Sequence, residues 1–235
     1  MTASQLTEEL ASESLSRYNV SMDIMEIGAK LALIFVPFVF ALCIHEYAHG
    51  LVAKWFGDNT AHAMGRLTLN PLAHADLIGT FVLPIATIIF GIPIFFGWAK
   101  PVPVDARQLK NPRTDMFWIA LAGPGSNLLM AFIAAGAMGF MMHQIPAMAS
   151  SVAFAKMLNY FILTNIFLAV FNLIPLHPLD GGKVIARFLP RQWNIWLEEN
   201  ENITGIILMV LIFSGALGIL RYPVIYLHTL LTGWI

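Results

Sequence analysis

Long apolar segments constrain the fold of this chain more than any other feature of its sequence. A helix needs about 20 mostly apolar residues to cross a bilayer, and residues 27–56, 116–141, 157–175 and 203–220 meet that requirement. Only 11% of the residues are charged, where soluble proteins have about a quarter. The sequence therefore predicts an all-α, polytopic membrane protein whose bundle core has about 4–6 transmembrane helices.

The polar stretches are too short for a separate soluble domain, which takes at least about 50 residues. We expect a polar N-terminal tail over residues 1–26 and one integral membrane domain over residues 27–235, with its core at 27–190. A formal net charge of -1 gives no indication of a nucleic-acid partner. Cys43 is the only cysteine, which excludes an intramolecular disulfide and a metal site built from several cysteines.

The pattern that can carry chemistry lies inside the first apolar segment and reads His45-Glu46-Tyr47-Ala48-His49. Residues four apart on a helix share a face, so both imidazoles can bind one zinc ion while Glu46 reaches a water on that ion. Zinc lowers the pKa of such a water to about 7, and Glu46 can accept its proton. Ionisable residues inside membrane helices are costly and usually functional, which favours a metal site over a chance match.

Two histidines leave the usual three-ligand set of a catalytic zinc ion incomplete. The best candidate for the third ligand is Asp180, in the run Leu179-Asp180-Gly181-Gly182 that follows the apolar segment 157–175. The two glycines allow a sharp backbone turn beside a metal. The alternative is an ordinary turn at a solvated helix end.

Together these motifs resemble those of the site-2 protease family of intramembrane metalloproteases. Three further stretches are similar to that family: residues 65–71 (GRLTLNP), 97–104 (GWAKPVPV) and 122–127 (AGPGSN). The resemblance extends from about residue 27 to residue 190 and is most like the small bacterial members, because no PDZ-like or CBS-like insertion is present.

The resemblance implies one zinc ion per chain and a transmembrane protein as substrate, cleaved within or near the bilayer. It also implies the roles of six residues: metal ligands His45, His49 and Asp180, the general base Glu46, and the substrate-binding residues Asn127 and Asn172. The expected location is a bacterial cell membrane, which the chain crosses several times.

Zinc binding would also constrain the topology. Ligand bonds of about 2 Å place His45 and Asp180 at the same membrane depth, so the helices that carry them run in the same direction, with 116–141 returning between them. Residues 78–96 then have no room for a net crossing, and we expect a re-entrant segment or a hairpin there. Lys and Arg are concentrated on the metal side, which the positive-inside rule assigns to the cytoplasm.

Two other functions stay open at this point. A metal-handling protein or ion transporter could use the same His, Glu and Asp side chains as an ion path, and a proteolytically silent scaffold could keep the zinc ion. The identity of the substrate and the oligomeric state are not determined by the sequence.

Overall fold

The computed structural model describes residues 24–90, 97–144 and 152–233. Most of the predicted N-terminal tail, residues 1–26, lies outside this part of the chain. The described residues form helices, and the β structure among them is an isolated antiparallel bridge between Ala75 and Ala99. The predicted all-α fold class is confirmed.

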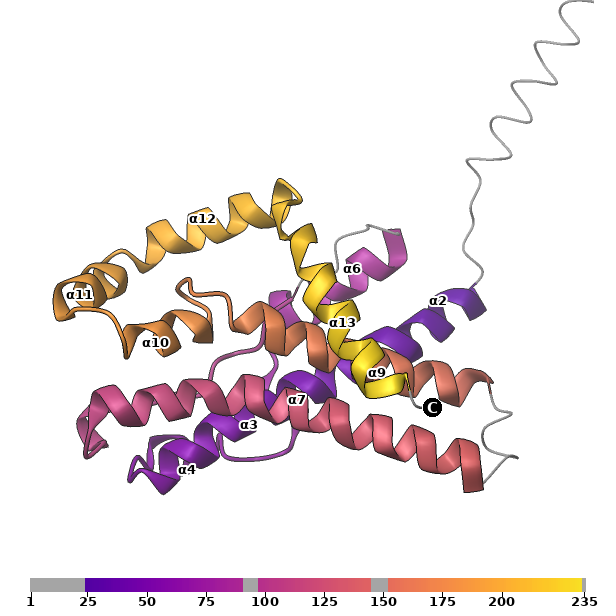
Figure 1. Cartoon of the computed structure of the whole chain (residues 1–235), viewed down its shortest axis with the longest axis horizontal. Coiled ribbons are helices and arrows are strands. Elements are labelled where there is room, and N and C mark those ends of the chain that lie inside the picture. The colour runs from indigo at the N-terminus through magenta and orange to yellow at the C-terminus, as the bar shows by residue number, and fades with distance from the viewer. Residues whose placement is uncertain (1–23, 91–96, 145–151, 234–235) are drawn as a thin grey trace, which may run out of the picture.

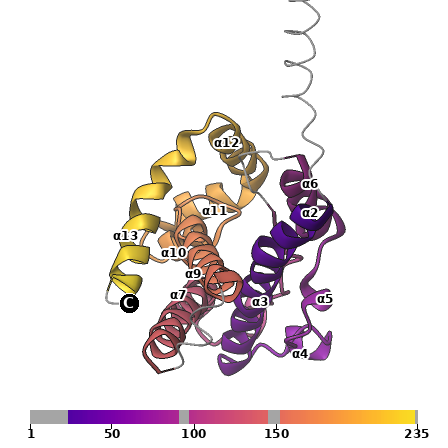
Figure 2. The same cartoon turned by 90° about the vertical axis from the view of Figure 1, so that its right-hand side faces the viewer.

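Three long helical segments make up the centre of the molecule (Figures 1 and 2). They are α2–η1–α3 (Ile24–Lys30, Leu31–Phe35 and Val36–Trp55), α7 (Pro112–Gln144) and α9 (Val152–Asn172). The first is continuous but contains a wide π-helical turn, η1, which ends two residues before Pro37. Proline has no N–H to donate into the preceding turn, and a widened turn is a common response to such an interruption.

The helix directions agree with the predicted topology. In Figure 1, α3 and α9 run one way along the molecule and α7 runs the other way. The three helices contact one another pairwise, and small residues on α7 allow close approach, since Ala131, Ala134 and Ala135 pack against Ile162 and Ile166 of α9. Small side chains at helix contacts are typical of membrane bundles.

Within the described residues, three helices are long and apolar enough to cross a membrane: Met25–Trp55, Pro112–Gln144 and Val152–Asn172. A fourth span is formed only if two helices separated by a bend are counted as one. The first is α12 (Glu201–Phe213). The second covers Ala216–Thr232 and consists of η4 (Ala216–Leu220) and α13 (Arg221–Thr232). These two helices meet at 76°. The segment predicted as a span over 203–220 is therefore not one continuous helix, because Gly215 adopts a left-handed φ of 75° and breaks the helix there.

The segment between α3 and α7 forms a hairpin, as predicted. Its outgoing part is a short apolar helix over Leu77–Phe90, made of η2 (Leu77–Val82) and α6 (Leu83–Phe90). The two ends of the hairpin are joined by backbone hydrogen bonds. Trp98 N donates to the Gly79 carbonyl (3.0 Å), and Lys100 N donates to the His74 carbonyl (2.8 Å). After the helix the chain therefore comes back beside the residues at which the helix begins. Residues 91–96, which belong to the predicted 78–96 segment, lie outside the described part of the chain.

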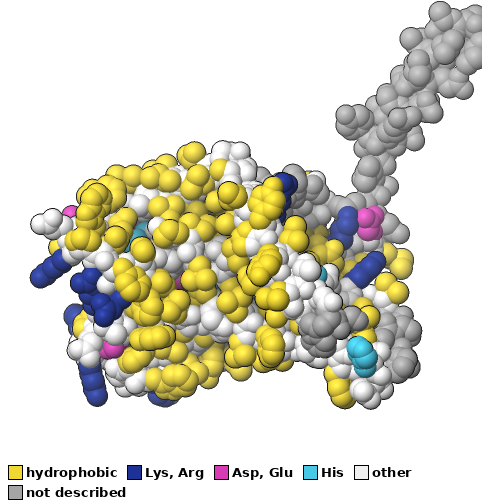
Figure 3. All heavy atoms as spheres, viewed as in Figure 1, with side chains coloured by type: hydrophobic (Ala, Val, Ile, Leu, Met, Phe, Trp, Pro, Cys, Tyr) yellow, Lys and Arg dark blue, Asp and Glu magenta, His cyan; other side chains and the backbone are white. Residues whose placement is uncertain are grey.

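The remaining elements are short. They are α4 (Thr60–Ala63), α5 (Pro71–His74), η3 (Ala106–Gln108), α10 (Asp180–Ala186) and α11 (Arg191–Glu199). Apolar side chains cover much of the visible length of the bundle, whereas Lys and Arg gather mainly at the end where α4, α10 and α11 lie (Figures 1 and 3). Such a distribution fits an integral membrane protein that crosses the bilayer several times.

Candidate metal centre and active site

Helix α3 places His45 and His49 one turn apart on the same face. Their Nε2 atoms lie 3.1 Å from each other, and both side chains are buried. The two rings stand nearly perpendicular, at 85°. The spacing of four residues thus produces the pair of convergent imidazoles that the sequence predicted.

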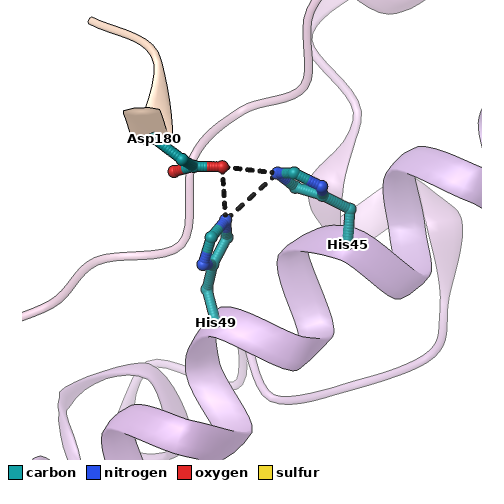
Figure 4. Close-up of side chains that lie close together, drawn as sticks. All are labelled: His45, His49 and Asp180. Atoms are coloured by element: carbon teal, nitrogen blue, oxygen red, sulfur yellow. Dashed lines mark hydrogen bonds and ion pairs between the residues drawn. The ribbon is translucent and has the colours of Figure 1, made fainter. Parts of the chain in front are cut away.

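Asp180 completes a three-residue cluster from a distant part of the chain. Its Oδ2 atom lies 3.1 Å from Nε2 of His45 and 3.2 Å from Nε2 of His49, and Figure 4 shows the carboxylate pointing at both rings. Asp180 is the first residue of α10, and the turn before it packs so tightly that a Cβ on Gly181 would collide with the carbonyls of Leu173 and Ile174. Glycine at 181 is therefore required for Asp180 to reach the histidines.

The protonation of the two histidines follows from their outer neighbours. Nδ1 of His45 lies 2.6 Å from Oδ1 of Asn127, and Nδ1 of His49 lies 2.7 Å from the Ile119 carbonyl. Both neighbours are acceptors, so each Nδ1 carries a proton that it donates outward, and Nε2 of each ring is the nitrogen that faces Asp180. Acceptors that bond to the outer ring nitrogen orient metal-binding histidines in the same way.

A cation fits this cluster chemically. Two nitrogen lone pairs and a carboxylate oxygen face one another, and Oδ2 of Asp180 is buried without a hydrogen-bond donor among the described residues. Zinc takes His nitrogen and Asp oxygen at about 2.0–2.2 Å, and tetrahedral bonds of that length separate two ligands by about 3.3–3.5 Å. The observed separations of 3.1–3.2 Å need only a small expansion to reach that range.

Glu46 is held by the return arm of the hairpin. Its Oε2 atom accepts a 2.8 Å hydrogen bond from the backbone N–H of Val102. Pro101 and Pro103 flank Val102 and have no N–H, so Val102 supplies the single backbone donor in this three-residue stretch. The segment 97–104, which resembles a family loop in sequence, thus touches the predicted general base directly.

The cluster opens into a cavity of about 450 Å³. His45, Glu46, His49 and Asp180 line it together with mainly apolar residues from the hairpin, α7, α9 and α12; Trp98, Ile119, Phe171 and Leu208 are examples. Asn172 lies on the cavity wall as well. An apolar chamber with a few convergent polar groups is the usual form of a catalytic pocket.

Comparisons with known proteins agree with this geometry. The model of "Peptidase family M50" matches residues 137–215, which contain Asp180 but neither histidine of the cluster. YwhC of Bacillus subtilis, named "Putative zinc metalloprotease", is 38% identical over 191 residues, which are 78% of this chain and 80% of YwhC. The chain belongs to peptidase family M50.

Two other relatives of this M50 chain bear the same description. Rip2 of Mycolicibacterium smegmatis is 28% identical over 83% of this chain and 71% of its own length. The Synechocystis protein sll0528 is 34% identical over 53% of this chain and 32% of its own length. No solved structure matches the chain. The resemblance to site-2 proteases is thereby confirmed at the level of the family, and the chain is an enzyme of a zinc metalloprotease family.

The two asparagines predicted to bind substrate occupy different environments in this M50 peptidase. Asn172 lines the cavity, and its Nδ2 donates to the Leu168 carbonyl of its own helix. Asn127 is fully buried and bonded to His45, Ala41 and Asn165. Substrate contact by either residue stays a prediction, and the position of Asn127 fits better with holding His45.

His177 lies close to Asp180 in sequence but outside the three-residue cluster. Its ring is buried against Gly182. Burial lowers the pKa of His177, and the nearby positive charge of Lys183 lowers it further. A neutral imidazole that packs under α10 explains its presence without a metal.

Gly123 contributes to the site in a way that the sequence did not indicate. A Cβ built on Gly123 would collide with Nε2 of His49 and would lie 2.6 Å from Nε2 of His45. The lack of a side chain on α7 therefore leaves room for both imidazoles. Gly123 belongs to the AGPGSN stretch, so the family motif was the available signal, but its contact with the rings required the fold.

Proposed function

We propose that this M50 peptidase is an intramembrane zinc metalloprotease, which binds one zinc ion through His45, His49 and Asp180. The observation that supports the proposal is the buried convergence of three acceptor atoms, 3.1–3.2 Å apart, from α3 and α10. Zinc, when bound, supplies Lewis acidity and lowers the pKa of water to about 7.

Glu46 is the general base in this proposal. Its carboxylate takes a proton from the attacking water and then gives that proton to the amine of the departing peptide. The N–H of Val102 restrains the carboxylate at Oε2. Because Glu46 follows His45 directly and lines the same cavity as the three ligands, it can act on a peptide bond held there.

The substrates in this proposal are transmembrane segments of other membrane proteins. The cavity walls are mainly apolar, and the catalytic motif lies on a helix that is itself long and apolar enough to span a bilayer. The substrate helix must unwind around a peptide bond before water can attack that bond. Asn172 on the cavity wall offers its side-chain amide to the unwound backbone.

We also propose that the protein resides in a bacterial cell membrane with the zinc site nearer the cytoplasm. The basic end of the molecule is the end where α4, α10 and α11 lie (Figures 1 and 3). Asp180 begins α10 and is therefore close to it. By the positive-inside rule that end faces the cytoplasm, and residues 27–235 act as one membrane domain.

The experiment compares wild type with Glu46→Gln, both purified with their metal and reconstituted in liposomes with a membrane-protein substrate. Loss of a general base lowers the rate by about 10²–10⁴-fold, while bound zinc should stay equal to wild type. Glu26→Gln is the matched control, because Glu26 lies on the same continuous helix but pairs with Lys30. Unchanged cleavage by Glu46→Gln would eliminate this mechanism.

The substrate can be found with the same variant. Glu46→Gln should retain uncut partners, which mass spectrometry of the purified complex identifies. The transporter alternative predicts instead that wild-type liposomes accumulate zinc without any cleavage. Membership of family M50 favours the protease.

A further inference from the structure

The buried side-chain amides of two asparagines link three helices by hydrogen bonds and reach the cluster of His45, His49 and Asp180. Asn165 on α9 donates from Nδ2 to the Phe161 carbonyl (2.9 Å) and accepts at Oδ1 from Nδ2 of Asn127 on α7 (2.9 Å). Asn127 in turn accepts at Oδ1 from Nδ1 of His45 on α3 (2.6 Å). Asn127 and Asn165 are both completely buried, and neither is among the residues that line the cavity.

We propose that Asn165 and Asn127 form a directional relay that fixes the tautomer and orientation of His45 so that its Nε2 lone pair faces the metal site. The proposal rests on the function proposed above, in which His45 is a zinc ligand. It makes Asn127 and Asn165 positioning residues, because neither touches the reacting atoms.

The direction of the relay is set by two backbone carbonyls. Carbonyl oxygens only accept hydrogen bonds, so the Phe161 carbonyl requires the NH₂ group of Asn165 on its side and leaves Oδ1 facing Asn127. The Ala41 carbonyl receives a second hydrogen bond from Nδ2 of Asn127, at 3.2 Å. The NH₂ group of Asn127 therefore faces two acceptors, and its oxygen faces His45.

The reverse orientation of Asn127 would disable the site. With its amide flipped, Asn127 would donate to Nδ1 of His45, and the proton of the neutral ring would move to Nε2, where the metal must bind. The flipped oxygen would also face Oδ1 of Asn165 and the Ala41 carbonyl. Buried acceptors without donors cost free energy, so the relay opposes the flip.

Asn127 also restrains the ring by spanning one turn of α3. It accepts from His45 and donates to Ala41, four residues earlier. Two anchoring points on one helix turn restrict both the position of the amide and the rotation of the imidazole. Loss of such outer partners typically lowers metal affinity by about 10–100-fold.

The chain offers a matched control for Asn165. Asn159 lies on the same helix and its Oδ1 bonds to Nε2 of His228, at 2.7 Å. This hydrogen bond joins α9 to α13 and involves none of the three residues His45, His49 and Asp180. Asn159→Leu therefore removes an Asn–His hydrogen bond from α9 without touching the relay.

The test measures zinc affinity by chelator competition on purified full-length protein, together with the melting temperature of the zinc-free form. We expect Asn127→Leu to weaken zinc binding about 10–100-fold and Asn165→Leu about 3–10-fold, since the Ala41 carbonyl still orients Asn127. Asn127→Asp keeps an acceptor for His45 and should bind zinc more tightly than Asn127→Leu. Asn159→Leu should stay within about twofold of wild type.

A spectroscopic measurement separates positioning from mere packing. In zinc-free protein with ¹⁵N-labelled histidine, the Nδ1 proton of His45, assigned by its loss in His45→Gln, should show the downfield shift of a hydrogen bond to Asn127. Asn127→Leu should lose this downfield shift. A variant that only loosened the packing would lower the melting temperature and leave the shift unchanged, which would overturn the proposal.

The outcomes distinguish the relay from the zinc site itself. If His45→Gln loses zinc while Asn165→Leu and Asn127→Leu both bind it as tightly as Asn159→Leu does, the relay is refuted and the zinc site stands. If His45→Gln binds zinc like wild type, both proposals fail. If Asn127→Leu does not fold, the zinc affinity of Asn165→Leu and the shift of the His45 Nδ1 proton in that variant decide.

Discussion

The backbone N–H of Val102 donates a 2.8 Å hydrogen bond to the carboxylate of Glu46. The hairpin between α3 and α7 therefore reaches the base on which catalysis is proposed to depend. Hydrogen bonds to charged groups contribute about 1.5–3 kcal/mol, which is enough to define the position of the carboxylate.

Val102→Pro should lower turnover about tenfold, because it removes this donor and leaves the Glu46 carboxylate without its restraint. Bound zinc should stay at the wild-type level. Val102→Ala keeps the N–H and serves as the control for the lost side chain. Equal turnover of the proline and alanine variants would show that the hydrogen bond has no catalytic role.

Gly123→Ala should abolish stoichiometric zinc binding. The added Cβ would occupy the space of Nε2 of both His45 and His49, and Cβ atoms essentially never approach other atoms so closely. Metal analysis of the purified protein measures the effect. Gly125→Ala, two residues along the same helix with nothing within 4 Å of its Cβ, should retain zinc; loss in both variants would point to a general change in α7.

Removal of the metal should destabilise the protein. The folded chain holds His45, His49 and Asp180 together, and a ligand at 100 times its Kd stabilises the folded state by about 2.7 kcal/mol. Chelation should therefore lower the melting temperature, and added zinc should restore it. In Asp180→Asn the zinc-dependent increase should be largely absent, and an unchanged increase would exclude Asp180 as a ligand.

Thr80→Val should destabilise the hairpin. The Thr80 hydroxyl is buried, donates to the Trp98 carbonyl (2.8 Å) and accepts from Asp76 N (2.9 Å). Valine has nearly the same shape but removes both of these hydrogen bonds from a buried position, at a cost of about 1–3 kcal/mol in the free energy of unfolding. Thr87→Val is the control, since the Thr87 hydroxyl donates to the Pro84 carbonyl of its own helix; thermal unfolding of the two variants gives the comparison.

Much of the His45, His49 and Asp180 cluster was predictable because two of its three residues lie close together in the sequence. Four-residue spacing on a helix brings His45 and His49 together wherever that helix lies. The choice of Asp180 was less direct and depended on the family resemblance. The hairpin prediction then followed from the requirement that two helices run in the same direction.

The span predicted over 203–220 shows what composition cannot reveal. Its apolar composition is that of a membrane span, but Gly215 adopts a positive φ and the helices on either side meet at 76°. Composition does not encode the conformation of a single glycine. Whether a glycine continues or breaks a helix depends on the neighbours it meets in the fold.

By itself the sequence determined the helical class, the apolar spans and the pair of imidazoles, because each depends on residues within a turn or a segment of one another. The tertiary structure alone decided that Asn165, Asn127 and His45 share a hydrogen-bonded chain, that Gly123 leaves room for the rings, and that Val102 meets Glu46. These contacts join residues far apart in the chain, and only the packing of α3, α7, α9 and the hairpin sets their distances and directions.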